Sequence, residues 1–293
     1  MNFKDLVRLL SLAAIWGSSF FFMRIASPVL GSAYLAEGRA FFAAIFLLCL
    51  AIFLKKNLRL LNNWRHFLIM GFFNSAFPFV LFGYASLTLQ VSQLSILNST
   101  APLWAFIIGL ITKSESFNIK RFFGLILGIV GVTLLLVNSL RPERFGELSA
   151  YILALVAAFS YGIATNYAKK SNSIEPFDNA HGSMWASAIL IIPVLLFIPI
   201  QSYPTTAVFL AVIALGVLCS GIAYLLYFKI IKDVGATSAL TVSFLIPLFA
   251  TLWGFVFLDE KIELNTIIGM VVVIIGTLLV TEFSFNKPIK TIK

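Results

Sequence analysis

The chain has 293 residues, of which 60% are hydrophobic and only 11% are charged, and 30 of them are phenylalanine. A typical soluble domain carries about 25% charged residues, so this composition excludes an ordinary soluble globular enzyme. The formal net charge of +9 would indicate nucleic-acid binding only if the lysines and arginines formed a basic face with aromatic or motif support, and the sequence contains no such pattern. We therefore expect no nucleic-acid partner.

Long apolar segments separated by short connectors follow one another along the chain. A helix needs about 20 apolar residues to cross a bilayer, so the sequence predicts an all-α membrane protein with ten spans. The first apolar run is too long for a signal peptide and no small-residue cleavage site follows it, so we interpret it as a span. The expected spans are residues 6–27, 33–54, 66–87, 92–112, 121–139, 148–168, 179–199, 206–228, 236–257 and 264–282.

The positions of lysine and arginine predict the orientation of these spans. Connectors on the cytoplasmic side of a membrane protein are rich in both residues. If the amino terminus is cytoplasmic, nearly all positive residues outside the spans fall on the inner side, and only Arg141, Arg144 and Lys261 fall on the outer side. We therefore expect a multi-pass protein with both termini in the cytoplasm.

The second half of the chain resembles the first at one constant offset, with no gap required. The repeat predicts two units, residues 1–140 and 146–293, of five spans each. Five is an odd number, so the second unit enters the membrane from the opposite side and the units have inverted topology. Residues that this offset aligns are called repeat mates: Trp16 with Tyr161, Gly17 with Gly162, Arg24 with Lys169, Pro102 with Pro247, Gly109 with Gly254, Glu115 with Glu260, Gly124 with Gly269 and Gly131 with Gly276.

Inverted repeats are common in secondary transporters, where the substrate site lies near the membrane midplane between the two units. Each unit can adopt the conformation of the other, so one chain has an outward-facing and an inward-facing state of similar energy. The repeat therefore predicts transport of a small-molecule substrate by alternating access.

Prolines at matched places point to the site. Pro102 in the fourth span and Pro247 in the ninth each remove a hydrogen bond from the carbonyl four residues earlier, and those carbonyls belong to Asn98 and Ser243. Lipid cannot satisfy a freed carbonyl, so these segments are expected to line a wet or ligand-filled cavity. The alternative is a proline kink that neighbouring hydroxyl groups satisfy.

The third and eighth spans repeat this pattern in part. Pro78 frees the carbonyl of Asn74, whereas the matched part of the eighth span has no proline but contains Ser220 and Gly221. Asn74 and Pro78 are therefore candidates for the same cavity wall.

Trp16 and its repeat mate Tyr161 lie about halfway through their spans. Tryptophan and tyrosine normally prefer the membrane interfaces, so at the midplane they are expected either to turn their polar tips into a cavity or to serve in packing. Further polar or amphipathic side chains complete the candidates: Ser19, Tyr84, Asn166, Trp185 and Tyr224.

Glu37 and Arg39 are charged residues near the start of the second span. Charges inside a membrane usually face the bundle interior or a water-filled space. We expect Arg39 to hold a substrate carboxylate, with Glu37 paired to Arg39 or to Arg24, unless these residues form a purely structural ion pair.

Glycines recur on the fifth span, at Gly124, Gly128 and Gly131, and on the tenth, at Gly269 and Gly276. Small residues let helix backbones approach closely. We expect both spans to serve as scaffold, with a homodimer contact as the alternative.

With these residues in view, the chain resembles the EamA family of the drug/metabolite transporter superfamily. The features that carry the resemblance are the Trp16-Gly17-Ser18-Ser19 segment, Arg39, the Thr100-Ala101-Pro102 segment, and Glu115 and Glu260 with the glycines that follow them. The resemblance implies a carrier of the bacterial inner membrane, commonly an exporter of amino acids or related small metabolites. It does not fix the substrate, because relatives also move sugars, nucleotide derivatives and drugs.

Glu115 and Glu260 lie just beyond the fourth and ninth spans, where we expect each to have a structural role, capping the start of the next helix through Ser116 or Asn118 and its counterpart. Proton coupling usually requires a titratable group buried near the site, and only Glu37 lies well inside a span. We therefore expect facilitated or exchange transport, or transport driven by the substrate's own charge.

Other functional classes lack support in the sequence. No P-loop signature for a nucleotide-driven pump is present. Cys49 and Cys219 lie singly in apolar runs, and the chain has only two histidines, so we expect no metal, no cofactor and no enzyme acting on lipid-linked substrates. A passive channel and a drug efflux carrier remain alternatives, and an intramembrane enzyme on lipid-linked substrates is a less favoured one.

Overall fold

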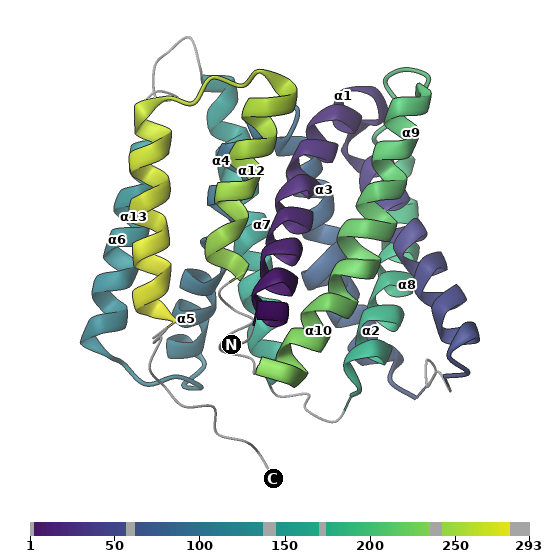
Figure 1. Cartoon of the computed structure of the whole chain (residues 1–293), viewed down its shortest axis with the longest axis horizontal. Coiled ribbons are helices and arrows are strands. Elements are labelled where there is room, and N and C mark those ends of the chain that lie inside the picture. The colour runs from purple at the N-terminus through teal and green to yellow at the C-terminus, as the bar shows by residue number, and fades with distance from the viewer. Residues whose placement is uncertain (1–2, 57–61, 137–144, 170–173, 235–241, 282–293) are drawn as a thin grey trace.

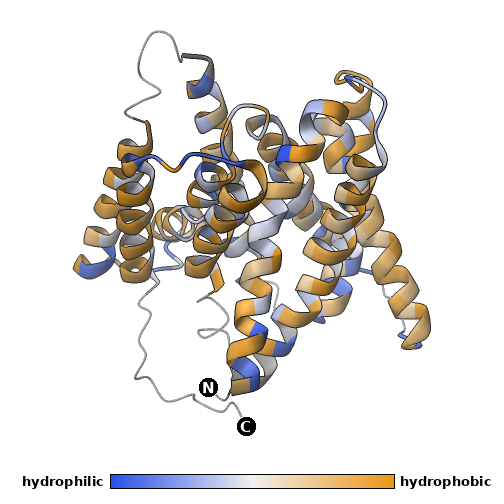
Figure 2. Ribbon diagram, turned by 45° about the horizontal axis from the view of Figure 1, so that its top comes forward, coloured by the Kyte–Doolittle hydropathy of each residue, from blue (hydrophilic) through white to orange (hydrophobic). Residues whose placement is uncertain are grey.

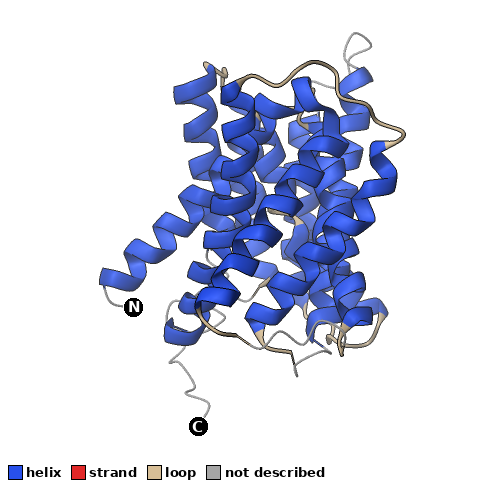
Figure 3. Cartoon of the chain, turned by 90° about the vertical axis from the view of Figure 1, so that its right-hand side faces the viewer, coloured by secondary structure: helices blue, strands red, loops and turns tan. Residues whose placement is uncertain are grey.

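The computed structural model describes residues 3–56, 62–136, 145–169, 174–234 and 242–281. Within these ranges all regular structure is helical and no strand is present (Figure 3). This agrees with the predicted all-α membrane class.

The first part of the chain contains the long helix α1 (Phe3–Phe53). At Gly31, φ is 72° and ψ is 167°, so two helical stretches meet there and the chain turns back (Figure 1). Glycine adopts such a positive φ without strain, and the turn separates the expected spans 6–27 and 33–54. The elements that follow are α2 (Trp64–Gly71), the π-helical segment η1 (Phe72–Ala76), α3 (Phe77–Ala85), α4 (Val91–Asn98), α5 (Ala101–Ile111) and α6 (Ile119–Leu136).

The second part begins with α7. Its expected span 236–257 begins in residues outside the described ranges, and α12 continues through Pro247 without a break. The helix interruption predicted at Pro102 is present between α4 and α5, but its predicted counterpart at Pro247 is not. The elements are α7 (Phe145–Lys169), α8 (Pro176–Leu195), α9 (Thr206–Ile213), the π-helical segment η4 (Ala214–Ile222), α10 (Ala223–Val234), α12 (Val242–Leu258) and α13 (Leu264–Val280).

Six helical stretches of the described chain are long and apolar enough to cross a membrane. Hydrophobic residues run along the helices, whereas hydrophilic residues gather at helix ends and in connectors (Figure 2), which is the pattern of a multi-pass membrane protein. The six stretches are Phe3–Phe53, Trp64–Ala85, Val91–Ile111, Ile119–Leu136, Glu147–Lys169 and Thr206–Tyr227, and the shorter Val242–Leu258 and Leu264–Val280 are also apolar.

Two glycines that are repeat mates allow close helix approach. A Cβ atom on Gly17 of α1 would lie 2.9 Å from the backbone nitrogen of Ala250 in α12. A Cβ atom on Gly162 of α7 would lie 2.9 Å from the backbone nitrogen of Ala105 in α5. Because Ala105 and Ala250 are aligned by the same offset, α1 packs against α12 as α7 packs against α5.

Helices α6 and α13 pack against each other through their glycines at one side of the molecule (Figure 1). A Cβ atom on Gly124 would lie 2.6 Å from the carbonyl oxygen of Gly276, and one on Gly131 would lie 2.9 Å from that of Gly269. The glycines predicted to serve as scaffold or dimer contacts therefore make a contact within one chain. A homodimer through the other faces of these helices stays a prediction.

Replacing Gly131 with valine is expected to destabilise the fold. The new side chain would meet Val273 and the Gly269 carbonyl oxygen, and overpacking of this kind costs roughly 1 to 3 kcal/mol. Thermal unfolding of the detergent-purified protein would show a lower Tm for Gly131→Val. Val130→Leu is the matched control, because Val130 is 45% exposed on the same helix; equal Tm values for the two variants would contradict the importance of the contact.

Candidate functional site

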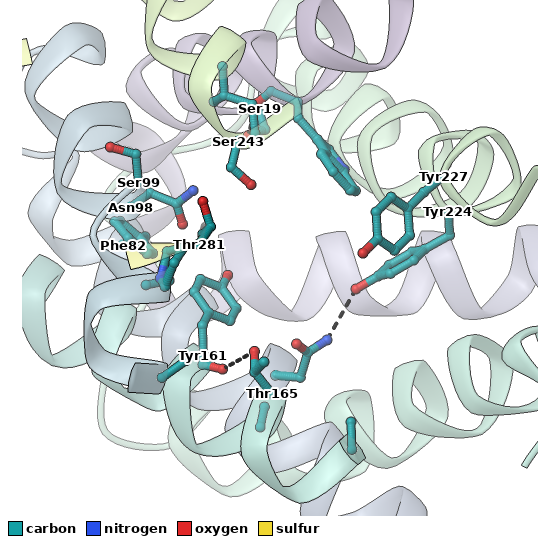
Figure 4. A pocket seen from close by; sticks show the side chains of 18 of the residues that line it. Ser19, Phe82, Asn98, Ser99, Tyr161, Thr165, Tyr224, Tyr227, Ser243 and Thr281 are labelled. Carbon is teal, nitrogen blue, oxygen red and sulfur yellow. Dashed lines mark hydrogen bonds between the residues drawn. The ribbon is translucent and has the colours of Figure 1, made fainter. Parts of the chain in front are cut away.

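A cavity of about 630 Å³ lies among helices from both parts of the chain (Figure 4). Small-molecule sites usually have volumes of about 300 to 1,000 Å³, so its size fits a metabolite. Nine of the predicted site residues line it: Trp16, Ser19, Arg39, Asn74, Asn98, Pro102, Tyr161, Tyr224 and Ser243.

Much of the lining consists of repeat mates. Both members of each such pair face the same cavity, so the two parts of the chain contribute corresponding positions to one site. The pairs are Trp16 with Tyr161, Ser19 with Ala164, Phe20 with Thr165, Met23 with Ala168, Asn74 with Cys219, Phe79 with Tyr224, Phe82 with Tyr227, Asn98 with Ser243, and Ala101 with Ile246.

Two ring contacts between the parts of the chain form aromatic walls. Trp16 of α1 meets Tyr227 of α10 with ring centroids 5.4 Å apart, and Phe82 of α3 stacks on Tyr161 of α7 at 6.2 Å and 22°. Tyr161 is the repeat mate of Trp16, and Phe82 is the repeat mate of Tyr227. The second contact is therefore the counterpart of the first, with the two parts of the chain exchanged. Such rings supply large, rigid apolar surfaces for a ligand.

The π-helical segments η1 and η4 contribute polar groups at matched positions. The Asn74 amide in η1 donates to the Tyr224 hydroxyl at 3.1 Å (Figure 4), and the Trp16 indole N–H donates to the backbone carbonyl of Cys219 in η4 at 3.1 Å. A π-helical turn often marks a functional site. Here each segment contributes one residue to the cavity lining, Asn74 from η1 and Cys219 from η4.

The interruption between α4 and α5 places polar groups at the cavity. Asn98 ends α4, and the neighbouring Ser99 carbonyl accepts a hydrogen bond from the Thr277 hydroxyl at 3.2 Å. In Figure 4 the side chains of Asn98, Ser243 and Tyr161 point into the open space. Among the described residues, none of these three side chains hydrogen-bonds to another protein group, so all three are free to bind a ligand.

Arg39 carries its positive charge into the cavity wall from the second stretch of α1. Its Nε atom donates to the Ser220 hydroxyl at 3.0 Å, and its guanidinium carbon lies 3.9 Å from the centre of the Phe79 ring. These contacts fix the group while its terminal nitrogens have no protein hydrogen-bond partner in the described ranges. A guanidinium held in this way can bind a carboxylate through two parallel hydrogen bonds.

Glu37 is not paired as the sequence suggested. Within the described chain it forms no ion pair with Arg39 or Arg24, and Arg24 instead donates to the carbonyls of Ser86 and Leu87 at 2.9 and 2.8 Å. Helical neighbours two residues apart point to different faces, which separates Glu37 from Arg39.

The lower end of the cavity is charged. Glu115, in the connector after α5, accepts hydrogen bonds from Lys169 and Arg121 at 2.7 Å each, and all three residues line the cavity. The hydrogen bond from Lys169 and then that from Arg121 hold the pKa of the Glu115 carboxyl below its usual value. Glu115 thus forms ion pairs, and the expected capping of α6 falls to Asn118, whose side chain accepts from the Lys120 N–H at 2.8 Å.

Five predicted site residues lie outside the cavity lining. Pro78 and Pro247 are buried within α3 and α12. Tyr84 is 46% exposed near the upper end of α3, where tyrosine commonly meets the membrane interface. The Trp185 indole donates to His181 at 3.2 Å, and the Asn166 amide donates to the carbonyls of Ala105 and Gly162 at 2.8 and 3.0 Å.

Sequence reasoning missed several lining residues that the repeat itself identifies. Phe79 and Phe82 are the repeat mates of Tyr224 and Tyr227, and Cys219 is the mate of Asn74. Taking the repeat mate of each predicted residue would have found Phe79 and Cys219. Glu115 and Lys169 were aligned with Glu260 and Arg24, but nothing in the sequence indicated that they reach the cavity.

The EamA-like transporter family model matches residues 6–137 and 148–282. The chain is similar to the uncharacterized transporter YoaV of Bacillus subtilis, at 23% identity over 97% of this chain and 98% of the relative. It is also similar to an uncharacterized transporter of Archaeoglobus fulgidus, at 28% identity over 96% and 98%. A solved crystal structure matches it with a TM-score of 0.68 at 16% identity, over 98% of this chain and 100% of the other, and so shares the fold.

The apolar helices, the interior cavity and these similarities together define a membrane transporter of the drug/metabolite kind, not an enzyme. Because the family model covers most of its length, the chain belongs to the EamA-like transporter family. This confirms the resemblance found in the sequence.

Replacing Asn166 with alanine is expected to lower stability without altering ligand binding. The substitution leaves the buried Ala105 carbonyl without its side-chain donor, a loss that typically costs about 1 to 3 kcal/mol. Thermal unfolding should therefore show a lower Tm for Asn166→Ala, whereas Asn98→Ala, which breaks no protein hydrogen bond, should keep the native Tm. The reverse order of Tm values would contradict this assignment of roles.

Proposed function

We propose that the chain is a secondary transporter made of two inverted five-helix repeats, residues 1–140 and 146–293, that moves a small metabolite by alternating access. The observation that carries this proposal is the cavity lining, in which repeat mates from the two parts of the chain face one site. Two further observations support it: one family model matches the chain twice, and the α1–α12 and α7–α5 contacts correspond. Inverted repeats around a central site are the usual basis of alternating access.

We place both termini in the cytoplasm of a bacterial cell, with the ten spans in the inner membrane. Helix α1 begins and α13 ends at the lower end of Figure 1, and Lys56, Lys113 and Lys169 lie in connectors or helix ends there. Lys261 belongs to the opposite end. The excess of positive residues at one end supports a cytoplasmic position for that end, and the cavity, which reaches Glu115 and Lys169, is then open to the cytoplasm.

The lining supports an amino acid or related small metabolite as substrate. Arg39 offers a fixed positive charge for a carboxylate, the Asn98, Ser243 and Tyr161 side chains offer hydrogen bonds, and the aromatic walls accept an apolar part. A cavity that is open to the cytoplasm can load a cytoplasmic metabolite, which supports export as the direction of transport.

We propose that transport is facilitated, occurs by exchange, or is driven by the substrate's own charge. Glu37 lies outside the cavity lining and so has no direct contact with the site. Counterflow, in which substrate on one side accelerates uptake from the other, distinguishes this carrier from a passive channel. A drug efflux carrier would accept large apolar cations, which Arg39 disfavours by charge repulsion.

A screen of metabolite pools against the purified protein is expected to reveal a ligand that raises Tm, because a ligand that binds only the native state stabilises it by mass action. Trp16→Ala and Asn98→Ala should abolish that shift, since both side chains line the cavity. Tyr84→Ala, outside the lining, is the control and should keep it. Full ligand-dependent stabilisation in both cavity variants would place the site elsewhere.

Replacing Arg39 with glutamine is expected to weaken binding of a carboxylate ligand found in that screen by about ten- to a hundredfold, the effect of losing a charge-assisted pair. Isothermal titration with the ligand and with its uncharged amide separates charge recognition from packing. Arg39→Gln should reduce the affinity for the carboxylate and leave that for the amide nearly unchanged. An equal loss for both ligands would mean that Arg39 shapes the cavity and does not bind the carboxylate.

A further inference from the structure

The cavity reaches the connectors at one end of the molecule but not those at the other. At the lower end it is lined by Glu115, Arg121 and Lys169, whereas the described upper connectors, residues 86–90, 196–205 and 259–263, contribute nothing to the lining. A transporter in one of its two states must hold its closed end shut with contacts that break in the other state. The upper end should therefore contain such a contact.

Glu260 joins two helices at that end. It lies in the connector between α12 and α13, and its two carboxylate oxygens accept hydrogen bonds from the backbone N–H of Val91 at 3.1 and 3.0 Å. Val91 is the first residue of α4, where the backbone N–H groups have no partner within the helix. The carboxylate thus links the end of α12 to the start of α4, two elements that are far apart in the sequence.

The surroundings fix Glu260 in this position. Its backbone N–H donates to the Gly254 carbonyl at 3.2 Å, and a Cβ atom on Gly254 would lie 2.5 Å from a Glu260 carboxylate oxygen. Val91 is fully buried, and the Gln90 amide donates to the Lys261 carbonyl at 3.3 Å beside it. The connector therefore folds back on α12 and presents the carboxylate to α4.

Electrostatics add to the link. Burial raises the pKa of the Glu260 carboxyl, and the Val91 N–H and the positive charge of Arg24 oppose this shift by stabilising the carboxylate. Arg24 also ties α1 to the end of α3 through the Ser86 and Leu87 carbonyls. The connector between α3 and α4 is therefore held on both sides: Arg24 binds the carbonyls that follow α3, and Glu260 binds the start of α4.

The repeat mate of Glu260 lies at the open end in a different setting. Glu115 accepts from Lys169, the mate of Arg24, and from Arg121, and its side chain lines the cavity. The two mated carboxylates thus lie toward opposite ends of the molecule, Glu115 in the cavity lining and Glu260 outside it. This difference in environment is expected if each takes part in closing its own end.

We propose that Glu260 is the latch of the closed upper end: its hydrogen bond to the Val91 N–H holds α12 against α4 and must break before the cavity opens at that end. The inference rests on the proposed alternating-access function and adds to it a residue that controls which end is open.

The test measures access to the cavity from each face of the membrane. Ser243→Cys places a thiol at a position that points into the cavity, in a background with Cys49→Ser and Cys219→Ala. A membrane-impermeant thiol reagent is applied to either face of oriented vesicles, and a protease-sensitive tag on the amino terminus identifies the face that carries it. In the otherwise unchanged protein, the reagent should modify the thiol rapidly from the terminus-bearing face and slowly from the opposite face.

Glu260→Ala should raise the modification rate from the opposite face about tenfold, the change in an equilibrium constant expected when one hydrogen bond to a charged group is lost. Glu115→Ala removes the repeat-mate carboxylate at the other end and should not raise that rate. Both variants remove one glutamate carboxylate, and the two carboxylates lie toward opposite ends of the molecule.

A second pair of variants tests the same bond without changing any charge. Val91→Pro removes the N–H donor at the first helical position, where proline is well tolerated, and Gln90 already has the extended backbone that precedes a proline, with φ of −67° and ψ of 158°. Val91→Ala loses the side chain but keeps the N–H. Val91→Pro should raise the rate from the opposite face and Val91→Ala should not.

The outcomes separate this proposal from the proposed function. One-sided modification that neither Glu260→Ala nor Val91→Pro changes would overturn the latch alone. Equal modification from both faces in the protein with native Glu260 and Val91 would also overturn the latch, because the upper end would then not be held closed. Absence of counterflow in that protein would overturn alternating access itself, because the cavity would then be a channel. If Glu260→Ala does not fold, the Val91 pair decides the question.

Discussion

The need to satisfy every backbone polar group in a nonpolar surrounding organises this structure. Lipid offers no hydrogen bonds, so an interrupted helix inside the membrane must find donors within the protein. Here those donors come from distant parts of the chain. The Thr277 hydroxyl donates to the Ser99 carbonyl at the break between α4 and α5, and the Ser160 hydroxyl donates to the Phe73 carbonyl in η1 at 2.7 Å. The Trp16 indole N–H donates to the Cys219 carbonyl in η4.

These bonds explain why the site lies where the helices are irregular. A regular helix presents only side chains to its neighbours, whereas η1, η4 and the end of α4 also present backbone groups that other helices must approach closely to satisfy. The approach brings Trp16 and Tyr227 together on one wall and Tyr161 and Phe82 on the other. The cavity lies between these contacts, and each irregular segment contributes a lining residue: Asn74 from η1, Cys219 from η4 and Asn98 from the end of α4.

The sequence predicted the helical membrane class, the main helices and nine lining residues, because hydrophobic length and proline position act locally. It did not predict which polar groups are already used. From the sequence alone, Asn98 and Asn166 are equally good candidates for binding a ligand. In the part of the chain that the structure describes, the Asn98 amide is free, whereas close helix approach brings the Ala105 backbone carbonyl within reach of the Asn166 amide. The continuity of α12 through Pro247 and the reach of Glu260 to Val91 also depend on packing between distant segments, which no local pattern records.

Arg39 is clamped from two directions, since Phe79 of α3 covers its guanidinium and Ser220 of η4 binds its Nε atom. Phe79 and Ser220 lie in different parts of the chain. Any displacement of α3 relative to η4 must therefore weaken one of these two contacts with Arg39. A released guanidinium regains rotational freedom and no longer presents a fixed fork to an anion. The affinity of Arg39 for an anion thus depends on how the two parts of the chain are arranged. A bound anion would in turn resist any movement that loosens the contacts of Arg39.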